Sequence, residues 1–459
     1  MPTSKSPLVE RDLQVFWHPC SQMREYRDHP PIEIAAARGA RLTLADGRHV
    51  LDAISSWWCK SLGHGHPGVR ARIEAQLARF EHVITANTTN APLVELCERL
   101  LAAANGGGAH FGKVFLADNG STAVEIAMKM ALQAQAQRGQ AGRTRFAALA
   151  GGYHGETVGT LSLGDLGLYS DPYRPLMFPV TKLGPLPFRS GTDDPRWMDA
   201  TPEWAAIEAT LQPLAGSLAA IVYEPVLQAA GGMRLYSPDL LRRLRRWADA
   251  HGVYLIADEI AAGMGRLGAM LATHLANDAG SQAASAWPDF AVLSKGLTAG
   301  FLPLSAVLTS DEIYALFDAE WDQRRAFLHS NTYTGNALGV AAALGALEAY
   351  RTEGVLAQAV ASGARMRSRL ADATRDLPFV RGLRGLGMVA ALDLTARDDG
   401  PLDPAARTGL QVARRALDGG ALLRPLGDTM YLFPPLNCPT DDLDRMVDIL
   451  ADSIAATFH

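Results

Sequence analysis

Short apolar runs alternate with longer helix-like runs through the middle of the chain. The apolar runs are Lys113–Ala117, Arg145–Ala150, Ala219–Tyr223, Val253–Ala257, Phe290–Leu293 and Leu304–Leu308. Their length and their turn-forming flanks predict strands that are buried on both faces. Helix patterns lie between and after them, at residues 121–137, 237–251 and 337–350. The alternation predicts an α/β fold with a mostly parallel sheet covered by helices on both faces.

The two ends of the chain have a different pattern. Leu42-Thr43-Leu44 precedes Asp46-Gly47, which predicts a hairpin, and the tail mixes helix and strand signals. We therefore predict a large central domain at residues 66–340. Residues 1–65 and 341–459 would together form a smaller α/β domain. Residues 184–202 and 277–288 are rich in turn-forming residues and are predicted surface loops.

Composition narrows the class of protein. The formal net charge of −5 over 459 residues makes neither nucleic acid nor an anionic membrane an expected partner. The four cysteines show neither paired nor metal-ligand spacing, which indicates a reducing compartment and no metal site. No apolar run approaches the roughly 18 residues of a membrane-spanning helix. We expect a soluble, cytoplasmic protein.

A lysine follows one of the predicted buried strands. Ser294-Lys295-Gly296 comes directly after Phe290–Leu293, and an amine at the edge of an apolar core is costly unless it is used. Asp258 ends the preceding strand. A lysine and a carboxylate so placed suit pyridoxal phosphate, whose aldehyde binds an amine and whose pyridinium nitrogen needs an acid. The plain alternatives are a surface turn for Lys295 and a helix cap for Asp258.

Further candidates follow other strands. Glu224 ends the strand before Asp258, so three ionisable groups would meet at one crevice of the sheet. Gly120 and Ser121 open a helix whose start can hold a phosphate, and Thr122-x-x-Glu125 fits a capping box there. Tyr153 lies in a glycine-rich turn and could stack on a ring or simply cover the sheet edge. The alternative interpretation of Glu224 is that it caps a helix.

Three more sites carry weaker signals. Asn331 and Thr332 belong to a polar run before a helix and form a second possible phosphate contact. The pair Trp57-Trp58 is more typical of a core than of a binding site. Arg424 precedes a proline, and an isolated arginine of this kind is usually at the surface.

Taken together, the motifs resemble those of fold-type I, class III aminotransferases. The resemblance extends from about Phe16 to Ile449 and rests on Ala117–Ser121, Gly152–Gly155, Ala257–Ile260 with Gly263-x-Gly265-Arg266, and Leu293–Gly296. It implies pyridoxal phosphate as cofactor and a large domain with a mostly parallel seven-stranded sheet. It also implies a small domain built from both termini and a homodimer with its active site at the interface.

Other segments resemble the biotin-pathway branch of that class. They are Trp17–Pro19, Ser55–Trp58, Met128–Ala131, Gly231–Met233 and Leu423–Pro425. The branch transfers the amino group of S-adenosylmethionine to 8-amino-7-oxononanoate and so forms 7,8-diaminononanoate. The resemblance leaves lysine open as an alternative donor. Another class III aminotransferase, acting on a diamine, an ω-amino acid or an aldehyde, is a second interpretation, and a binding module that has kept only the fold is a third.

The resemblance also implies roles for the cofactor-binding residues. Lys295 would attach the cofactor covalently, and Asp258 would pair with the ring nitrogen. Gly120 and Ser121 would hold the phosphate, and Thr332 would reach it from the other subunit.

The substrate contacts follow in the same way. Tyr153 would stack on the cofactor ring and border the substrate, and Trp57 would line the channel. Arg424 would meet the carboxylate of the oxononanoate, and Ser330 and Asn331 would make substrate and phosphate contacts.

The chain departs from the family pattern in three places. Cys20 stands where some members carry a substrate-facing tyrosine, so that role is not carried over. Asn336-Ala337 replaces Asn-Pro, and Leu267 replaces a common threonine. None of these positions is Lys295 or Asp258, so the predicted core chemistry is unaffected. Arg266 is expected to be a supporting charge at the pocket edge.

Overall fold

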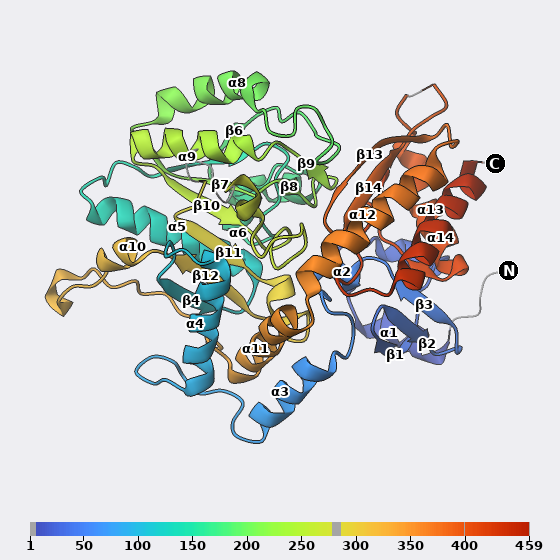
Figure 1. Cartoon of the computed structure of the whole chain (residues 1–459), viewed down its shortest axis with the longest axis horizontal. Helices are drawn as coiled ribbons and strands as arrows, with labels where there is room; N and C mark the ends of the chain where they lie inside the picture. The colour runs from blue at the N-terminus through green and yellow to red at the C-terminus, as the bar shows by residue number, and fades with distance from the viewer. Residues whose placement is uncertain (1–5, 278–285, 399, 459) are drawn as a thin grey trace.

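The computed structural model describes residues 6–277, 286–398 and 400–458. Figure 1 shows a large α/β part and a smaller part in which the N-terminal (blue) and C-terminal (red) segments lie together. Strand β15 (Ala421–Leu422) pairs in parallel with β3 (His49–Asp52), so the two ends of the chain share one sheet. The predicted boundary at residue 340 lies inside α11 (Ala337–Thr352), and the division at residues 65 and 340 stays a prediction.

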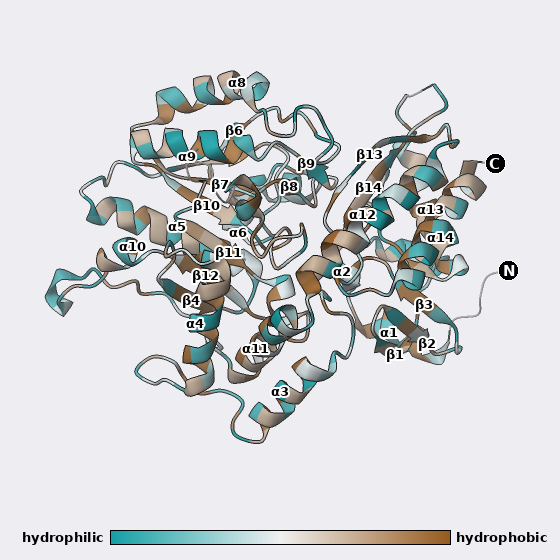
Figure 2. Ribbon diagram, viewed as in Figure 1, coloured by the Kyte–Doolittle hydropathy of each residue, from teal (hydrophilic) through white to brown (hydrophobic). Residues whose placement is uncertain are grey.

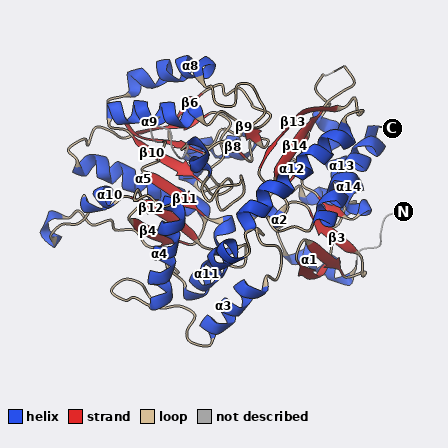
Figure 3. Cartoon of the chain, viewed as in Figure 1, coloured by secondary structure: helices blue, strands red, loops and turns tan. Residues whose placement is uncertain are grey.

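The large part is built on a seven-stranded sheet with the order β4-β12-β11-β10-β7-β5-β6. Its strands are β4 (Lys113–Ala117), β5 (Arg145–Leu149), β6 (Thr181–Leu183), β7 (Leu218–Tyr223), β10 (Tyr254–Asp258), β11 (Phe290–Leu293) and β12 (Ser305–Thr309). Only β12 runs against its neighbours, β11 and β4. The fold class is confirmed, and Figure 3 shows these strands among helices. The pattern of apolar runs missed β6, which is three residues long.

Helices cover both faces of this sheet, as the buried runs require. Along β11, Phe290 and Val292 pack in a cluster with the apolar side of α5 (Gly120–Gln137). The alternate residues Ala291 and Leu293 belong to the main core on the other face. That core also holds buried residues of α4 (Ala91–Asn105), α8 (Thr201–Leu211), α9 (Asp239–His251) and α11. Figure 2 shows the apolar and polar sides of α9 as brown and teal.

The smaller part contains two short sheets and three longer helices. Their orders are β1-β2-β3-β15 and β13-β14-β16. The bounds are β1 (Ile34–Arg38), β2 (Arg41–Leu44), β13 (Val380–Leu386), β14 (Val389–Leu394), β16 (Thr429–Leu432), α12 (Val355–Thr374), α13 (Thr408–Gly419) and α14 (Thr440–Phe458). Strands β2 and β3 form the predicted hairpin. The remaining α-helices and strands are α1 (Pro7–Val15), α2 (Ser55–Trp58), α3 (Pro67–Leu77), α6 (Val158–Leu163), α7 (Gly167–Ser170), α10 (Asp311–Ala315), β8 (Leu227–Gln228) and β9 (Arg234–Leu235), and the other described elements are short 3₁₀ helices.

Two sequence predictions need correction. The helix α5 has no capping box: its N-cap is Asn119, whose side chain accepts from the N–H of Thr122 at 3.0 Å. Glu125 instead accepts from Gly159 N–H. The predicted surface loop at 184–202 does lack helices before Thr201, but Arg189 within it is buried and bonded to Glu203 at 2.9 Å. Most of the predicted loop at 277–288 lies outside the described residues.

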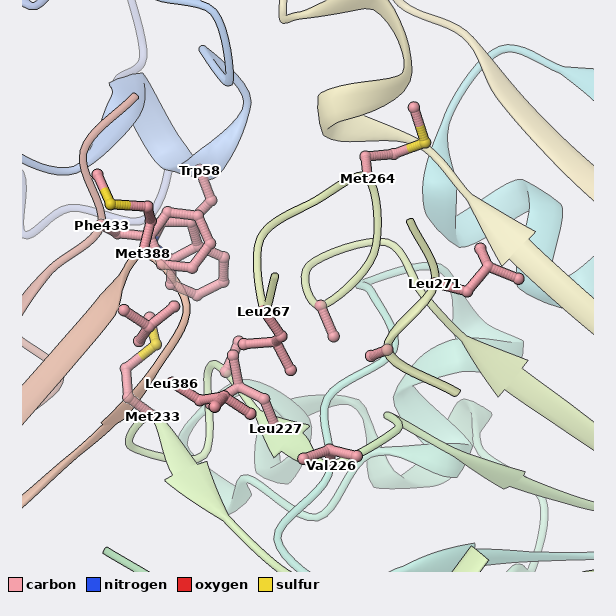
Figure 4. Packing of buried hydrophobic residues seen from close by; sticks show 14 of the residues in the cluster. Trp58, Val226, Leu227, Met233, Met264, Leu267, Leu271, Leu386, Met388 and Phe433 are labelled. Atoms are coloured by element: carbon pink, nitrogen blue, oxygen red, sulfur yellow. The ribbon is translucent and has the colours of Figure 1, made fainter. Parts of the chain in front are cut away.

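The two parts meet through a shared apolar core, part of which Figure 4 shows. Trp58 and Phe433 pack with their ring centres 5.7 Å apart, near Met388 and Leu267. The Arg266 guanidinium lies 3.8 Å above the Phe433 ring and donates to the carbonyls of Met388 and Pro434 at 3.0 and 2.6 Å. Arg266 is therefore a buried residue whose contacts link the two parts.

Candidate active site

A cavity of about 170 Å³ opens at the carboxyl ends of the strands of the large sheet. Six of the candidate residues line it: Gly120, Ser121, Tyr153, Glu224, Asp258 and Lys295. The convergence follows from topology, because β7, β10 and β11 are parallel neighbours and their ends meet at one edge.

Lys295 lies where β11 ends and a short 3₁₀ turn (Lys295–Thr298) begins. Its Nζ is 5.2 Å from the centre of the Trp58 ring, so an aromatic face borders the amine. Burial lowers the pKa of Lys295, although the charges of Asp258 and Glu224 act against that shift. A larger share of neutral amine is therefore present near pH 7 than in an exposed lysine.

Asp258 is paired with a histidine that the sequence analysis did not single out. His154 Nδ1 lies 2.8 Å from Asp258 Oδ2, and both side chains are buried. The second carboxylate oxygen of Asp258 accepts from Ile260 N–H at 3.1 Å. The available signal for His154 was its place next to Tyr153 in the predicted motif, although nothing in that motif indicated its pairing with Asp258. The plain reading of Asp258 as a helix cap is wrong.

Glu224 holds the loop that carries Tyr153. Its two carboxylate oxygens accept from the N–H groups of Tyr153 and Ala229 at 3.0 and 3.1 Å. Burial raises the pKa of Glu224 to about 7, and the Asp258 charge adds to that rise. Glu224 therefore lines the cavity and holds the Tyr153 loop through hydrogen bonds; it does not cap a helix.

The start of α5 is in close contact with two neighbouring loops. A Cβ on Gly155 would lie 2.1 Å from Ser121 Oγ, and one on Gly120 would lie 2.7 Å from Ile260 Cδ1. Gly155 is required here, because its φ is +123° and the Ser121 backbone Cα would be 3.1 Å from that Cβ, whereas at Gly120 the contact is with the movable end of the Ile260 side chain. The first N–H groups of a helix have no partner within it, and those of Gly120 and Ser121 belong to the cavity wall. This corner is suited to a phosphate.

Trp57 and Arg424 lie together but do not line this cavity; Trp57 precedes Trp58, which does. The Arg424 guanidinium is 4.7 Å from the Trp57 ring and donates to the backbone carbonyl of Cys20 at 2.7 Å. Trp57 is 43% exposed, whereas Trp58 is 6% exposed and belongs to the core. The interpretation that both tryptophans are core residues is therefore correct for Trp58 alone.

Two further residues, Glu156 and Tyr169, lie beside Tyr153. The Tyr153 hydroxyl donates to Glu156 at 3.0 Å, and the Tyr153 and Tyr169 rings are 5.9 Å apart. Burial, with a contribution from the Cys20 thiol, raises the pKa of Tyr169 to about 12. Cys20 therefore lies close to both Tyr169 and Arg424. Only long-range folding brings these segments together, so no local signal marked Tyr169.

Ser330, Asn331 and Thr332 do not line the cavity of their own chain. Ser330 and Thr332 are exposed, and Asn331 N–H donates to Thr334 Oγ1 at 3.0 Å. Among the described residues no three His, Cys, Asp or Glu side chains gather as a metal site would require. No helix in the described ranges is long and apolar enough to cross a bilayer.

Comparison with known proteins identifies the family. The Aminotransferase class-III family matches residues 22–454. The chain belongs to the class III aminotransferases. It is 39% identical to the adenosylmethionine-8-amino-7-oxononanoate aminotransferase of Synechococcus elongatus, over 95% of this chain and 97% of that protein.

Two solved structures of transaminases resemble this one. The first is the adenosylmethionine-8-amino-7-oxononanoate aminotransferase of Methanocaldococcus jannaschii, with a TM-score of 0.89, 31% identity and 98% of each chain covered. The second is a PLP-bound amine transaminase from an uncultivated Pseudomonas species, with a TM-score of 0.87, 33% identity, and 96% of this chain and 98% of that chain covered.

Pyridoxal phosphate is the cofactor of this aminotransferase, and the residues of the cavity fit it. A half-buried amine, a buried carboxylate and a helix start stand on different walls of one cavity. They would take the aldehyde, the ring nitrogen and the phosphate respectively. The cavity therefore carries the three kinds of group that the cofactor needs.

Proposed function

We propose that this aminotransferase moves the amino group of S-adenosylmethionine to 8-amino-7-oxononanoate, which gives 7,8-diaminononanoate for biotin synthesis. The observation that carries the proposal is the contact of the Arg424 guanidinium with the ring of Trp57, which precedes the cavity-lining Trp58 in the chain. The names of the relatives from Synechococcus elongatus and Methanocaldococcus jannaschii support it independently.

The shape of the acceptor suits this arrangement. An oxononanoate has a reacting ketone, an apolar chain and a terminal carboxylate. Trp58 borders the amine of Lys295, and Trp57 follows directly and stacks against Arg424. An aromatic wall between an amine and an arginine matches that order of groups, since arginine binds carboxylates in a two-point geometry.

The chain's own residues have separate tasks in the reaction. When bound, pyridoxal phosphate takes up an amino group and draws electrons from the reacting carbon. Lys295 Nζ, with its lowered pKa, accepts and returns a proton at the substrate carbon. Asp258, oriented by His154, would pair with the ring nitrogen of the bound cofactor. Glu224 fixes the backbone of Tyr153, whose ring would stack on the cofactor.

A second candidate is transfer from a simple diamine or ω-amino acid. The Pseudomonas neighbour is an amine transaminase and is 33% identical over nearly the whole chain. The fold and the lysine would serve both reactions equally. The two candidates differ in the donor and in their need for Arg424.

Half-reaction spectroscopy separates these candidates. S-adenosylmethionine, lysine and a diamine are each added to the cofactor-loaded enzyme while the visible cofactor absorption is followed. We expect S-adenosylmethionine to remove the absorption and 8-amino-7-oxononanoate to restore it. Loss of absorption with the diamine alone would establish the second candidate instead.

The acceptor end has its own test. We expect Arg424→Ala to raise the acceptor concentration for half-maximal restoration about tenfold or more, because a carboxylate loses its charged partner. Arg365→Ala is the matched control, since Arg365 is paired with Asp444 on α14. An unchanged concentration in Arg424→Ala would remove this residue from the acceptor site.

We further propose a homodimer in which the partner completes each site. Ser330 and Thr332 are exposed outside their own cavity, next to a run with exposed apolar side chains that includes Leu328 and Tyr333. Thr332 would reach the phosphate of the other subunit, and Ser330 and Asn331 would make phosphate and substrate contacts. The four cysteines are free, which supports a cytoplasmic location.

A further inference from the structure

Four consecutive residues of α2 have left-handed backbone conformations, and none of them is glycine. Their φ angles are 50° at Ser55, 45° at Ser56, 76° at Trp57 and 70° at Trp58. In this region the Cβ of an L-residue crowds the following carbonyl, so such residues normally occur singly. A run of four needs contacts that hold it.

Asp52 supplies two of those contacts, and the Ser55 hydroxyl supplies another by donating to the Phe433 carbonyl at 2.7 Å. Its Oδ1 accepts from Ser56 N–H at 2.9 Å, and its Oδ2 accepts from the Ser56 hydroxyl at 2.6 Å. Asp52 is fully buried. Burial pushes its pKa upward, but the hydrogen bonds from His64 and Ser56 outweigh burial and leave the pKa below its ordinary value. The carboxylate therefore stays charged and accepting.

His64 secures Asp52. Its Nε2 donates to Asp52 Oδ2 at 2.8 Å, and its side chain is 12% exposed. The backbone of His64 is fixed separately, because it exchanges two hydrogen bonds with Gly39 at 2.8 and 2.9 Å. The His64 imidazole is therefore held in place and donates to Asp52, and through Asp52 it restrains the turn at Ser55–Trp58.

The two tryptophans of the turn depend on it to different degrees. Trp58 has further contacts: its Nε1 donates to the Tyr431 hydroxyl at 3.1 Å, and its ring packs on Phe433. Trp57 is 43% exposed and has Arg424 as its ring contact. Loss of the hydrogen bonds to Asp52 would therefore free Trp57 first and leave Trp58 in place beside Lys295.

We propose that His64, acting through Asp52, is a positioning residue that orients Trp57 against Arg424 and so sets the affinity for the carboxylate end of the acceptor. This inference rests on the proposed function, which places the acceptor carboxylate at Arg424. His64 itself contacts neither the cavity nor the amine. A purely structural role would instead affect both half-reactions alike.

The kinetic test uses cofactor-loaded His64→Ala and His64→Gln. We expect His64→Ala to raise the acceptor KM about tenfold, because the buried carboxylate loses a charged hydrogen bond. The donor half-reaction should change by less than about threefold. His64→Gln should recover most of the affinity, since its amide can donate to Asp52. His66→Ala is the control, because that buried histidine pairs with Glu353 away from the turn.

A double-mutant cycle identifies the route of the effect. In a Trp57→Ala background, His64→Ala should cause no further loss of acceptor affinity. An additive loss, or an equal change in both half-reactions, would overturn the proposal. The cycle is run with whichever carboxylate acceptor the enzyme uses. A wrong acceptor assignment is detected with the unmutated enzyme and is therefore distinct from a failure of His64.

A second readout needs no activity. In the apoenzyme, His64→Ala should increase the quenching of tryptophan fluorescence by acrylamide, because a released Trp57 is more accessible. The increase should be absent when Trp57→Phe is also present. An increase that survives Trp57→Phe would assign the change to another tryptophan and overturn the proposal.

Discussion

Lys295 and Lys113 show how the surroundings of a lysine set its behaviour. Burial lowers the pKa of Lys295, whereas the ion pair with Asp311 at 2.7 Å raises the pKa of Lys113 at the molecular surface. A lysine that must react as a neutral amine needs the first environment and would be disabled by the second. The difference can be measured without substrate or cofactor.

We predict that Lys295 reacts with an amine-labelling reagent at lower pH than Lys113 in the same apoenzyme. Peptide mass mapping across a pH series gives both midpoints. Glu224→Gln should move the Lys295 midpoint further down, because the carboxylate charge of Glu224 raises that pKa. The idea fails if Lys295 titrates at or above Lys113.

Replacement of the amine tests its chemical role directly. We expect Lys295→Ala to lower turnover about a thousandfold or more, because both covalent attachment and proton transfer are lost. The phosphate corner at Gly120 and Ser121 is untouched, so dialysed protein should still retain cofactor. Lys113→Ala serves as control. Amino-group exchange at the native rate in Lys295→Ala would contradict the assignment.

At the scale of elements, the start of α5 matters because it forms the predicted phosphate corner. Asn119, not Thr122, caps this helix. We expect Asn119→Ala to lower the free energy of unfolding by about 1 kcal/mol. Thr122→Ala should have a smaller effect, because the Thr122 side chain only donates to Asn119 at 3.1 Å. Urea unfolding of the two variants measures the difference, and equal losses would refute the cap assignment.

The large sheet was predictable because its strands are buried on both faces. Such strands appear as continuous apolar runs, and the polar residues that follow them mark the sheet edge. Lys295 and Asp258 were found in this way. The three-residue strand β6 is too short to produce that signal.

Contacts between distant segments were not predictable. His154 and Asp258 are 104 residues apart, and the pattern around each gives no sign of the other. The turn at Ser55–Trp58 was hidden for a different reason. Serine and tryptophan disfavour left-handed conformations, so its geometry depends on contacts from distant segments, among them the hydrogen bonds of Asp52 and His64.

At the scale of the whole molecule, one chain supplies Lys295 and Asp258 to its cavity but leaves Thr332 outside it. In the proposed homodimer, each site combines Lys295 of one chain with Thr332 of the other. The placement of Thr332 can be tested by pairing two inactive chains. Thr332→Asp should inactivate by placing a negative charge against the phosphate, and Lys295→Ala removes the amine.

We predict that a heterodimer of Lys295→Ala and Thr332→Asp chains, isolated through two different tags, regains about half of the native activity. One of its sites combines a native Lys295 with a native Thr332, and the other carries both lesions. If Thr332 acted within its own chain, each site would carry one lesion and no activity would return. The control pairs Lys295→Ala with Asp258→Ala. Both residues belong to one cavity, so that pair stays inactive in either arrangement, and activity regained by it would contradict the assignment of these residues.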